Sequence, residues 1–367
     1  MQMDVIGGKK MSGEKLQEFL CQETEVRDLG NESLLHECPA FGQAVGAAIN
    51  DGHLVPFSME LSEHLKDMDL YKASLLSNFI GFVCEKEGDT SAGKGIVQLF
   101  ATSCKLVYEM FCSIGTEDGC ELPPEFPELY QINSEWSKAY CGFNVLCIST
   151  MAFLTRDASL RKYLETFDLA EQIDFLTEET PESPYLRSIC YVGSMLKTCS
   201  NLKLLVLQPG RQQGFYAEAN DLNNCFQLLF LLEEQIIKTY GGKYGVEKFC
   251  AADSMIKLAH GEYPDDVWGK SYVTCFMECN YSTADHTRFN NDDSMALIWG
   301  EMPPDGIPMV DGYAVIVLFE GGMTRSFDAS FLMVPHNALN PYVDIEKELS
   351  EEEYAMWMEK IGNAMAK

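Results

Sequence analysis

The chain has 367 residues, with 27 Lys or Arg against 56 Asp or Glu, and its formal net charge is −29. A hydrophobic fraction of 46% with 11% aromatic residues excludes a mainly disordered chain, and the length suggests two or three domains. The negative charge, without a run of clustered Lys or Arg, argues against nucleic acid or an anionic membrane surface as partner and leaves a basic protein allowed.

Helical periodicity dominates the first 260 residues. Leu16, Phe19 and Leu20 stand at i, i+3 and i+4 behind Ser12, whose hydroxyl can cap the first turn. Gly, Pro and Asn separate the later periodic segments. The spacing predicts further helices at about 40–50, 58–86, 95–114, 134–156, 159–177, 184–208, 220–240 and 246–260.

Short runs rich in β-branched and aromatic residues follow from about residue 263. They predict strands at 271–278, 295–299, 313–319 and 324–334. The third run is apolar on both faces, which is typical of a central strand. Gly321 and Gly322 predict a hairpin turn between the third and fourth strands.

The last predicted element is a helix that starts at Ser350. Glu353 stands three residues further on, so the two side chains can form a capping box. Tyr354, Trp357 and Ile361 then form one apolar stripe, which we expect to pack on the small sheet.

These elements predict a two-domain α+β protein. We expect a large all-α domain at 11–262, folded as helical repeats or as an irregular bundle, and then a small α+β domain at 263–367. The second domain would hold an antiparallel sheet and a C-terminal helix.

Residues 140–208 show a faint self-similarity at an offset of 42 residues. Leu154, Leu160, Arg161 and Leu164 correspond to Leu196, Leu202, Lys203 and Val206. This period, in a segment with only helical patterns, resembles armadillo and HEAT repeats. The resemblance implies a curved scaffold that binds another protein along an extended surface, and the alternative is a bundle without such a groove.

The cysteines and the N-terminus indicate a cytoplasmic protein. The 14 cysteines lie mostly in apolar helical runs without any C-x-x-C spacing, so we expect reduced and buried thiols. Residues 1–10 lack an apolar core, so we expect no signal peptide, and no segment has the roughly 18–20 apolar residues that span a bilayer.

One string has the spacing of a phosphate-binding loop. Gly88 to Gly95 fits G-x-x-x-x-G-K, but Gly95 replaces the Ser or Thr whose hydroxyl holds magnesium. No strand that leads directly into the first glycine is predicted, so we interpret the segment as a solvated loop between two helices. We therefore expect no nucleotide cofactor.

Neither a metal site nor a catalytic motif is indicated. The histidines show no H-x-x-x-H or H-E-x-x-H spacing, and no G-x-S-x-G elbow occurs. A Cys–His pair that meets only in space is not visible from the sequence. We expect no metal and no cofactor.

Two loops of the C-terminal part are candidate binding sites. The loop at 285–293 gathers polar and charged groups between two strands, where binding residues commonly stand. In the proline-rich loop at 300–312, we expect two exposed methionines to form an apolar contact patch together with Ile307. The candidate binding residues are Asp285, His286, Arg288, Asp292, Asp293, Met302 and Met309.

The sequence favours a non-enzymatic interaction protein that binds a basic protein partner, such as an adaptor, an inhibitor or an immunity-type protein. A DNA-mimicking acidic protein is a narrower form of the same hypothesis. The alternative is an enzyme with a site at the junction of the two domains that uses the 285–293 loop.

Overall fold

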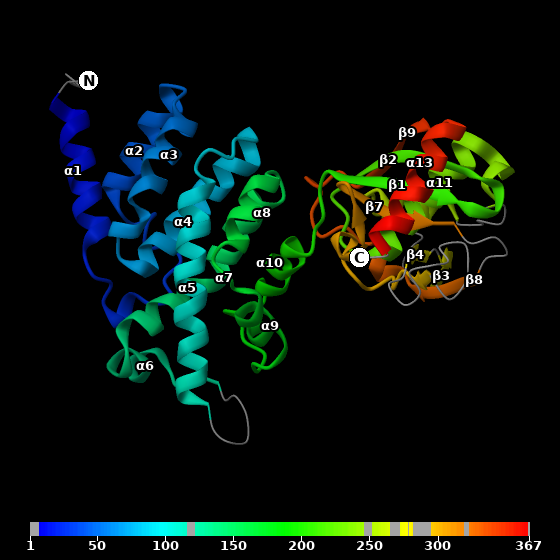
Figure 1. Ribbon diagram of the computed structural model, residues 1–367. Helices are drawn as coiled ribbons and strands as arrows, with labels where there is room; N and C mark the ends of the chain where they lie inside the picture. Colours follow the sequence, from blue (N-terminus) through cyan, green and yellow to red (C-terminus); the bar gives the residue numbers. More distant parts are fainter. Residues whose placement is uncertain are drawn as a thin grey trace. The chain divides into compact units, whose positions relative to one another are not determined.

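The chain divides into a helical unit and a sheet-containing unit. The computed structural model describes residues 7–115, 122–245, 252–264, 272–277, 279–281, 295–318 and 323–365. The two compact units are Met1–Leu196 and Lys197–Lys367. The predicted order is confirmed, because the first unit is helical and the second holds a sheet followed by a C-terminal helix (Figure 1).

The division falls at residue 196 and not at the predicted residue 262. A helix was predicted over 184–208, but residues 202–208 are a strand. The helices at 225–240 and 253–259 belong to the same hydrophobic core as this strand. The run from Leu202 to Leu207 is apolar at all but one position. Such a run fits a buried strand as well as a buried helix, so its periodicity could not separate the two.

The first unit is built from α-helices. The helices are α1 (Gly7–Cys21), α2 (Pro39–Asn50), α3 (Leu54–His64), α4 (Leu70–Glu87), α5 (Gly93–Ile114), α6 (Phe126–Ile132), α7 (Ser134–Leu154), α8 (Ala158–Glu165), α9 (Ala170–Glu178) and α10 (Ile189–Leu196). Asp69 caps the start of α4 and Asn133 caps the start of α7 through their side chains. Gly88, in the left-handed conformation, ends α4.

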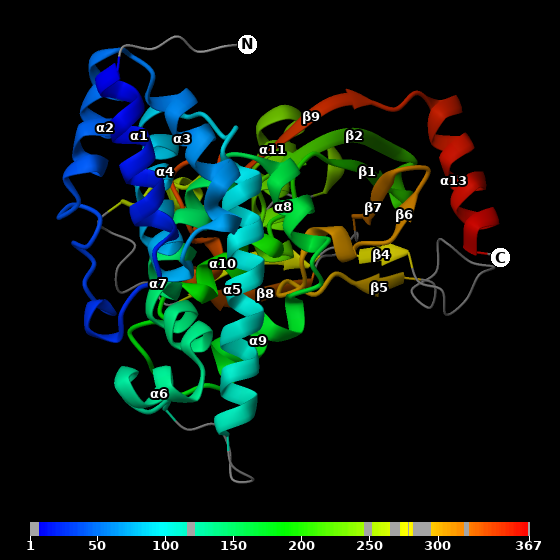
Figure 2. The ribbon, with the colours of Figure 1, turned by 90° about the vertical axis from the view of Figure 1, so that its left-hand side faces the viewer.

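Helices α4, α5 and α7 form the centre of this unit (Figures 1 and 2). Small residues let α4 and α7 approach closely. A Cβ atom added at Gly142 would lie 2.6 Å from the Cβ atom of Ser74, and one added at Gly81 would lie 3.1 Å from the Cα atom of Ser149. The buried hydroxyl of Ser77 donates to that of Ser149 at 2.9 Å, which satisfies polar groups inside the contact.

A buried ion cluster joins the segment after α1 to α4 and α7. The ammonium group of Lys138 lies 3.2 Å from a carboxylate oxygen of Asp69 and 3.1 Å from carboxylate oxygens of both Glu23 and Glu135. The Lys138 and Asp69 side chains are 4% and 1% exposed. The amide and hydroxyl of Thr24 donate to Asp69, so this carboxylate is fully hydrogen-bonded despite its burial.

We expect Asp69→Asn to lower the free energy of unfolding by about 1–3 kcal/mol, because it removes the buried negative charge beside Lys138 and one of the acceptors of Thr24, while Glu23 and Glu135 still pair with the lysine. Burial raises the pKa of Asp69, but the bonds from Thr24 and Lys72 and the charge of Lys138 outweigh it, so the pKa lies below 3.8. The stabilisation is therefore present above pH 3.8 and is lost as the pH falls through the folded-state value. Denaturant unfolding followed by circular dichroism measures it.

The matched control is Asp67→Asn, an exposed carboxylate two residues away, which should change stability by less than about 0.5 kcal/mol. Equal, small effects of the two substitutions would contradict a stabilising role for the cluster.

The second unit is built on a mixed sheet. Its elements are β1 (Leu202–Gln208), β2 (Gln213–Asn220), α11 (Cys225–Tyr240), α12 (Asp253–Ala259), β3 (Tyr272–Met277), β4 (Cys279–Tyr281), β5 (Met295–Leu297), β6 (Met309–Val310), β7 (Tyr313–Val317), β8 (Met323–Asp328), β9 (Tyr342–Glu348) and α13 (Glu351–Met365). Figure 2 shows β9, β2, β1 and β7 following one another across the sheet, and β4 and β5 continue it.

The sheet is not wholly antiparallel as predicted, because β1 and β7 pair in parallel, with Leu204 opposite Ala314. The predicted hairpin between 313–319 and 324–334 is wrong as well. β7 pairs with β1, β4 and β6, whereas β8 pairs with β3 in a separate two-stranded sheet. Glycines permit a tight turn but do not determine which strand pairs with which. Strand pairing depends on packing between residues that are far apart in the sequence.

Both faces of the sheet are covered within this unit. Leu204, Val206 and Phe215 share one core cluster with α11 and α12. Leu205 and Leu207 point to the other face, where the predicted stripe of α13 packs on them. The capping box is also confirmed, since the amide of Ser350 donates to Glu353 at 2.9 Å and the amide of Glu353 donates back to the Ser350 hydroxyl at 3.2 Å.

The 42-residue offset does not describe a structural repeat. Leu160 and Leu164 lie in α8, whereas their counterparts Leu202 and Val206 lie in strand β1. Leucine and valine spacing matched here because both segments bury apolar residues, although one does so as a helix and the other as a strand.

His260 fastens α12 to the rest of the second unit. Its Nε2 atom lies 2.9 Å from a carboxylate oxygen of Glu234 in α11, and its Nδ1 atom lies 3.3 Å from the carbonyl of Pro341. The bond to Glu234 raises the pKa of His260 above 6.5 in spite of burial, and the charge of Glu262 adds to the rise.

We expect His260→Gln to cost more stability at pH 6 than at pH 9. A raised folded-state pKa gives a contribution that is complete below the unfolded-state value and disappears as the pH rises through the folded-state value. Melting curves of the wild type and the variant across this range measure it, and a difference independent of pH would refute the assignment.

Candidate functional site

The polar loop predicted from the sequence lies outside the described residues. Asp285, His286, Arg288, Asp292 and Asp293 all fall within 282–294. The binding role of this loop therefore stays a prediction, and so does the enzymatic alternative that depends on it.

The two predicted methionines do not form one contact patch. Met302 packs against the core cluster beneath α11, and the neighbouring Ile307 is 1% exposed. Met309, in β6, is 49% exposed. The apolar members of the 300–312 loop are thus divided between the interior and the surface, because the short helical turn at Pro304–Gly306 directs Ile307 inward.

The buried thiols are poorly suited to nucleophilic chemistry. Burial raises the pKa of Cys84 to about 11 and that of Cys104, Cys141 and Cys225 to about 12. The thiolate is the reactive form, so these cysteines serve as small apolar core residues. Cys84, Cys104, Cys141, Cys147 and Cys225 are buried and form no disulfide bond.

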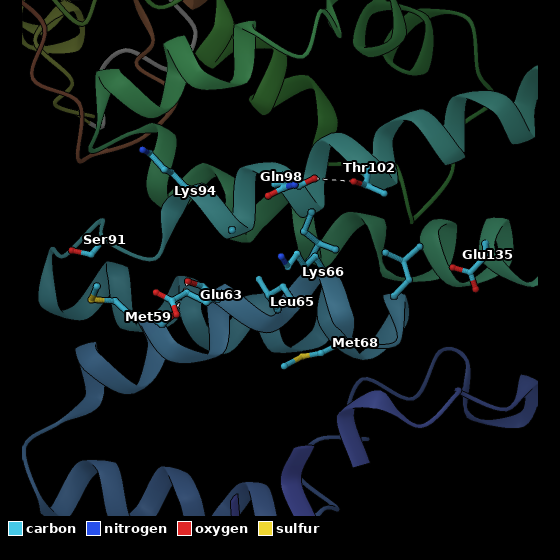
Figure 3. Close-up of a pocket in the computed structure, with 14 residues that line it drawn as sticks. Met59, Glu63, Leu65, Lys66, Met68, Ser91, Lys94, Gln98, Thr102 and Glu135 are labelled. Atoms are coloured by element: carbon cyan, nitrogen blue, oxygen red, sulfur yellow. Dashed lines mark hydrogen bonds between the residues drawn. The ribbon is translucent and has the colours of Figure 1, made fainter. Parts of the chain in front are cut away.

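A groove of about 510 Å³ lies on the helical unit between α3 and α5; we call it the α3–α5 groove (Figure 3). Its floor consists of the buried residues Ser62, Leu65, Leu70 and Leu99. Exposed polar and charged side chains form its rim. These are Glu63, Lys66, Ser91, Lys94, Gln98, Thr102 and Glu135.

The groove lies beside a close contact between α3 and α5. A Cβ atom added at Gly95 would lie 2.4 Å from the carbonyl oxygen of Ser62, so only glycine permits this contact. Just beyond it α3 ends at His64, and the chain passes through a 3₁₀ turn, Leu65–Asp67, into the start of α4. The groove is the space that α3, this turn and the start of α4 leave beside α5.

The segment Gly88–Gly95 thus contributes to the lining of the groove, but it does not form a phosphate-binding loop. It connects helix α4 to helix α5, as interpreted from the sequence, and no strand precedes it. Gly95 stands where a phosphate loop has Ser or Thr because the backbone of α3 occupies the space of a side chain.

The two ends of the groove differ in charge. Lys94 and Ser91 lie at one end, Glu135 lies at the other, and Lys66 lies between them (Figure 3). Glu135 belongs to the ion cluster, where three carboxylates surround one ammonium group. Burial lowers the pKa of Lys138, but its bonds to Glu135 and Glu23 raise it well above the usual value, so this lysine stays protonated.

A second surface feature is an acidic face on α9 and its flanking turns. Residues 165–182 contain seven exposed carboxylates and no Lys or Arg. Within α9, Glu171, Asp174 and Glu178 stand at i, i+3 and i+7, while Ile173 and Leu176 on the opposite side are buried. We call these seven residues the α9 acidic face: Glu165, Asp168, Glu171, Asp174, Glu178, Glu179 and Glu182.

An open hollow of about 400 Å³ adjoins the end of the α9 acidic face. Its floor includes the buried residues Leu176, Leu186 and Ile189, and Glu182 stands on its rim. Arg187 lines the hollow too, so its charge is mixed locally.

The sequence analysis identified neither the groove nor the α9 acidic face. The acidic face had a readable signal, because seven carboxylates occur within 18 residues without a Lys or Arg among them. The groove had none, since it depends on where α3 leaves α5.

Within the described ranges no three His, Cys, Asp or Glu side chains are arranged to hold a metal ion, and no helix is long and apolar enough to cross a membrane. No family model, curated protein or solved structure matches this chain.

We expect Gly95→Ala to destabilise the protein by about 1–3 kcal/mol, because the added methyl group collides with the backbone of α3 and forces the helices apart. Thermal unfolding of the full chain measures the loss. Gly42→Ala is the matched control, since a Cβ atom at this position of α2 meets nothing within 4 Å and the substitution should stabilise the protein by about 0.5–1 kcal/mol. Equal effects of the two substitutions would contradict the close contact.

Proposed function

We propose that this protein is a non-enzymatic binding module for a basic polypeptide. The observation that supports it most directly is the α9 acidic face together with the hollow at its end. All seven carboxylates between 165 and 182 are exposed and no Lys or Arg lies within that stretch, and the hollow offers apolar surface beside Glu182.

The charge of each unit is consistent with such a partner. Residues 1–196 contain 14 Lys or Arg and 31 Asp or Glu, a net charge of −17, and residues 197–367 contain 13 and 25, a net charge of −12. A field of one sign raises the encounter rate with an oppositely charged partner and weakens as salt screens it. The Debye length is about 8 Å at physiological ionic strength, so carboxylates close to the partner matter most.

The chemistry of the hollow suits a lysine or arginine side chain. The aliphatic stem of such a residue can lie on Leu176 and Leu186 while its charged end reaches Glu182. Arg187 opposes a second cation in the same place, so we propose one basic side chain in the hollow and further ones along α9.

An adaptor, an inhibitor and an immunity-type protein all remain forms of this proposal. A cytoplasmic location is proposed with it, supported by the free thiols of the described cysteines.

The triple variant Glu171→Gln, Glu178→Gln and Glu182→Gln should weaken binding of fluorescein-labelled decalysine by at least fivefold in 50 mM salt. The loss should shrink at 300 mM salt, because the lost interaction is electrostatic. Fluorescence anisotropy with the full chain measures it.

The control removes the same net charge from exposed positions elsewhere in the helical unit, through Glu14→Gln, Glu109→Gln and Glu128→Gln. If both triple variants weaken binding equally, decalysine senses only the net charge, and the α9 acidic face is not the docking surface.

A further inference from the structure

The α3–α5 groove carries opposite charges at its two ends and apolar surface between them. Glu135 is 53% exposed at one end, next to Glu23, and the single ammonium group of Lys138 lies between these carboxylates and Asp69. Three negative charges against one positive charge leave this end negative. A cation that approaches Glu135 therefore meets an attractive field.

The other end is positive. Lys94 lies at this end and Lys66 lies further along the groove (Figure 3), and neither lysine forms an ion pair within the part of the chain that the structure describes. Glu63 stands on the rim beside them and reduces the local field without cancelling two lysines. A carboxylate placed near Lys66 and Lys94 gains a charge partner.

The length of the groove sets the size of its occupant. Lys94, Gln98 and Thr102 follow one side of α5 over eight residues, which corresponds to about 12 Å at 1.5 Å per residue. An extended chain covers that distance with about four residues. Leu65, Leu70 and Leu99 form an apolar floor between the charged ends, and Met59 and Met68 add side chains that adapt to different shapes.

We propose that the α3–α5 groove binds a short extended peptide segment in which a basic and an acidic residue flank two or three apolar residues. The basic residue lies at Glu135, the apolar residues lie on the leucine floor, and the acidic residue lies near Lys66 and Lys94. The inference rests on the proposed function in that the segment belongs to a polypeptide partner, but it uses a different surface.

The probe is the fluorescein-labelled, C-terminally amidated pentapeptide Lys-Leu-Ala-Leu-Glu, tested by anisotropy on the full chain in 50 mM salt. Glu135→Gln and Lys94→Gln should each weaken binding by about fivefold. Thr102→Trp should reduce it by at least tenfold, because the indole fills the groove and leaves the ion cluster intact.

Two matched controls should stay within twofold of the wild type. Glu128→Gln removes an exposed carboxylate on α6, outside the groove, and Ser113→Trp adds an indole to an exposed position further along α5. Circular dichroism melting curves identify any variant that has lost its fold.

Replacing the probe's Lys by Gln completes a double-mutant cycle with Glu135→Gln. The two changes together should cost no more than either alone, because each removes the same charge pair. Additive losses of affinity would overturn the inference. So would a wild-type protein that binds Lys-Leu-Ala-Leu-Glu no more tightly than Gln-Leu-Ala-Leu-Gln. Groove variants that bind the probe as tightly as their controls would overturn it as well.

The two surfaces can fail separately. If decalysine binding depends on the α9 acidic face and the pentapeptide does not bind, the groove is not a peptide site and the proposed function still stands. If pentapeptide binding depends on Glu135 and Thr102 while decalysine binding is unchanged in the α9 variants, the groove is a peptide site and the α9 acidic face is not a docking surface.

Discussion

The buried pair of Asp69 and Lys138 is the constraint on which much of the helical unit depends. Asp69 caps α4, accepts bonds from Thr24, and places a counter-charge beside Lys138 of α7. The segment after α1 and two central helices are thus fixed by a single carboxylate. Removing Lys138 would leave the buried Asp69 carboxylate without a counter-charge, whereas removing Asp69 would leave Lys138 paired with the more exposed carboxylates of Glu23 and Glu135. The same cluster holds Glu135 at the end of the α3–α5 groove, so a stabilising interaction also determines the electrostatic character of a surface feature.

Close backbone contacts are the second organising element. Gly142 and Gly81 bring α4 and α7 together, and Gly95 brings α5 against α3. Each glycine is needed because a neighbouring atom already occupies the position of a Cβ atom. Where the contact at Gly95 ends, α3 turns away and leaves a groove with an apolar floor. Packing and binding surface therefore have one cause here, which is the point at which two helices stop touching.

The acidic surplus has two different uses in the molecule. Some carboxylates are structural, such as Glu353 in the capping box of α13 and Glu234 against His260. Others, on the α9 acidic face, lie at exposed positions of a helix whose opposite side packs inward. An exposed carboxylate can contact a partner even where it also bonds inside the fold, as Glu135 does to Lys138, so the exposure of each carboxylate decides whether it can take part in docking. This distinction makes a net charge of −29 a weak guide to a docking surface until the residues are placed.

The sequence by itself determined the order of a helical part and a β-rich part, the capping box at Ser350 and the apolar stripe of α13. These depend on residues within a few positions of one another, where periodicity and capping act directly. Tertiary structure alone decided that residues 202–208 are a strand, that β7 pairs in parallel with β1 and not with β8, and that Gly95 lies against α3. An apolar run fits a helix or a strand equally well, and the partner that buries it lies far away in the chain. The groove and the charge at its ends depend on such contacts between distant residues, so no local sequence pattern could predict them.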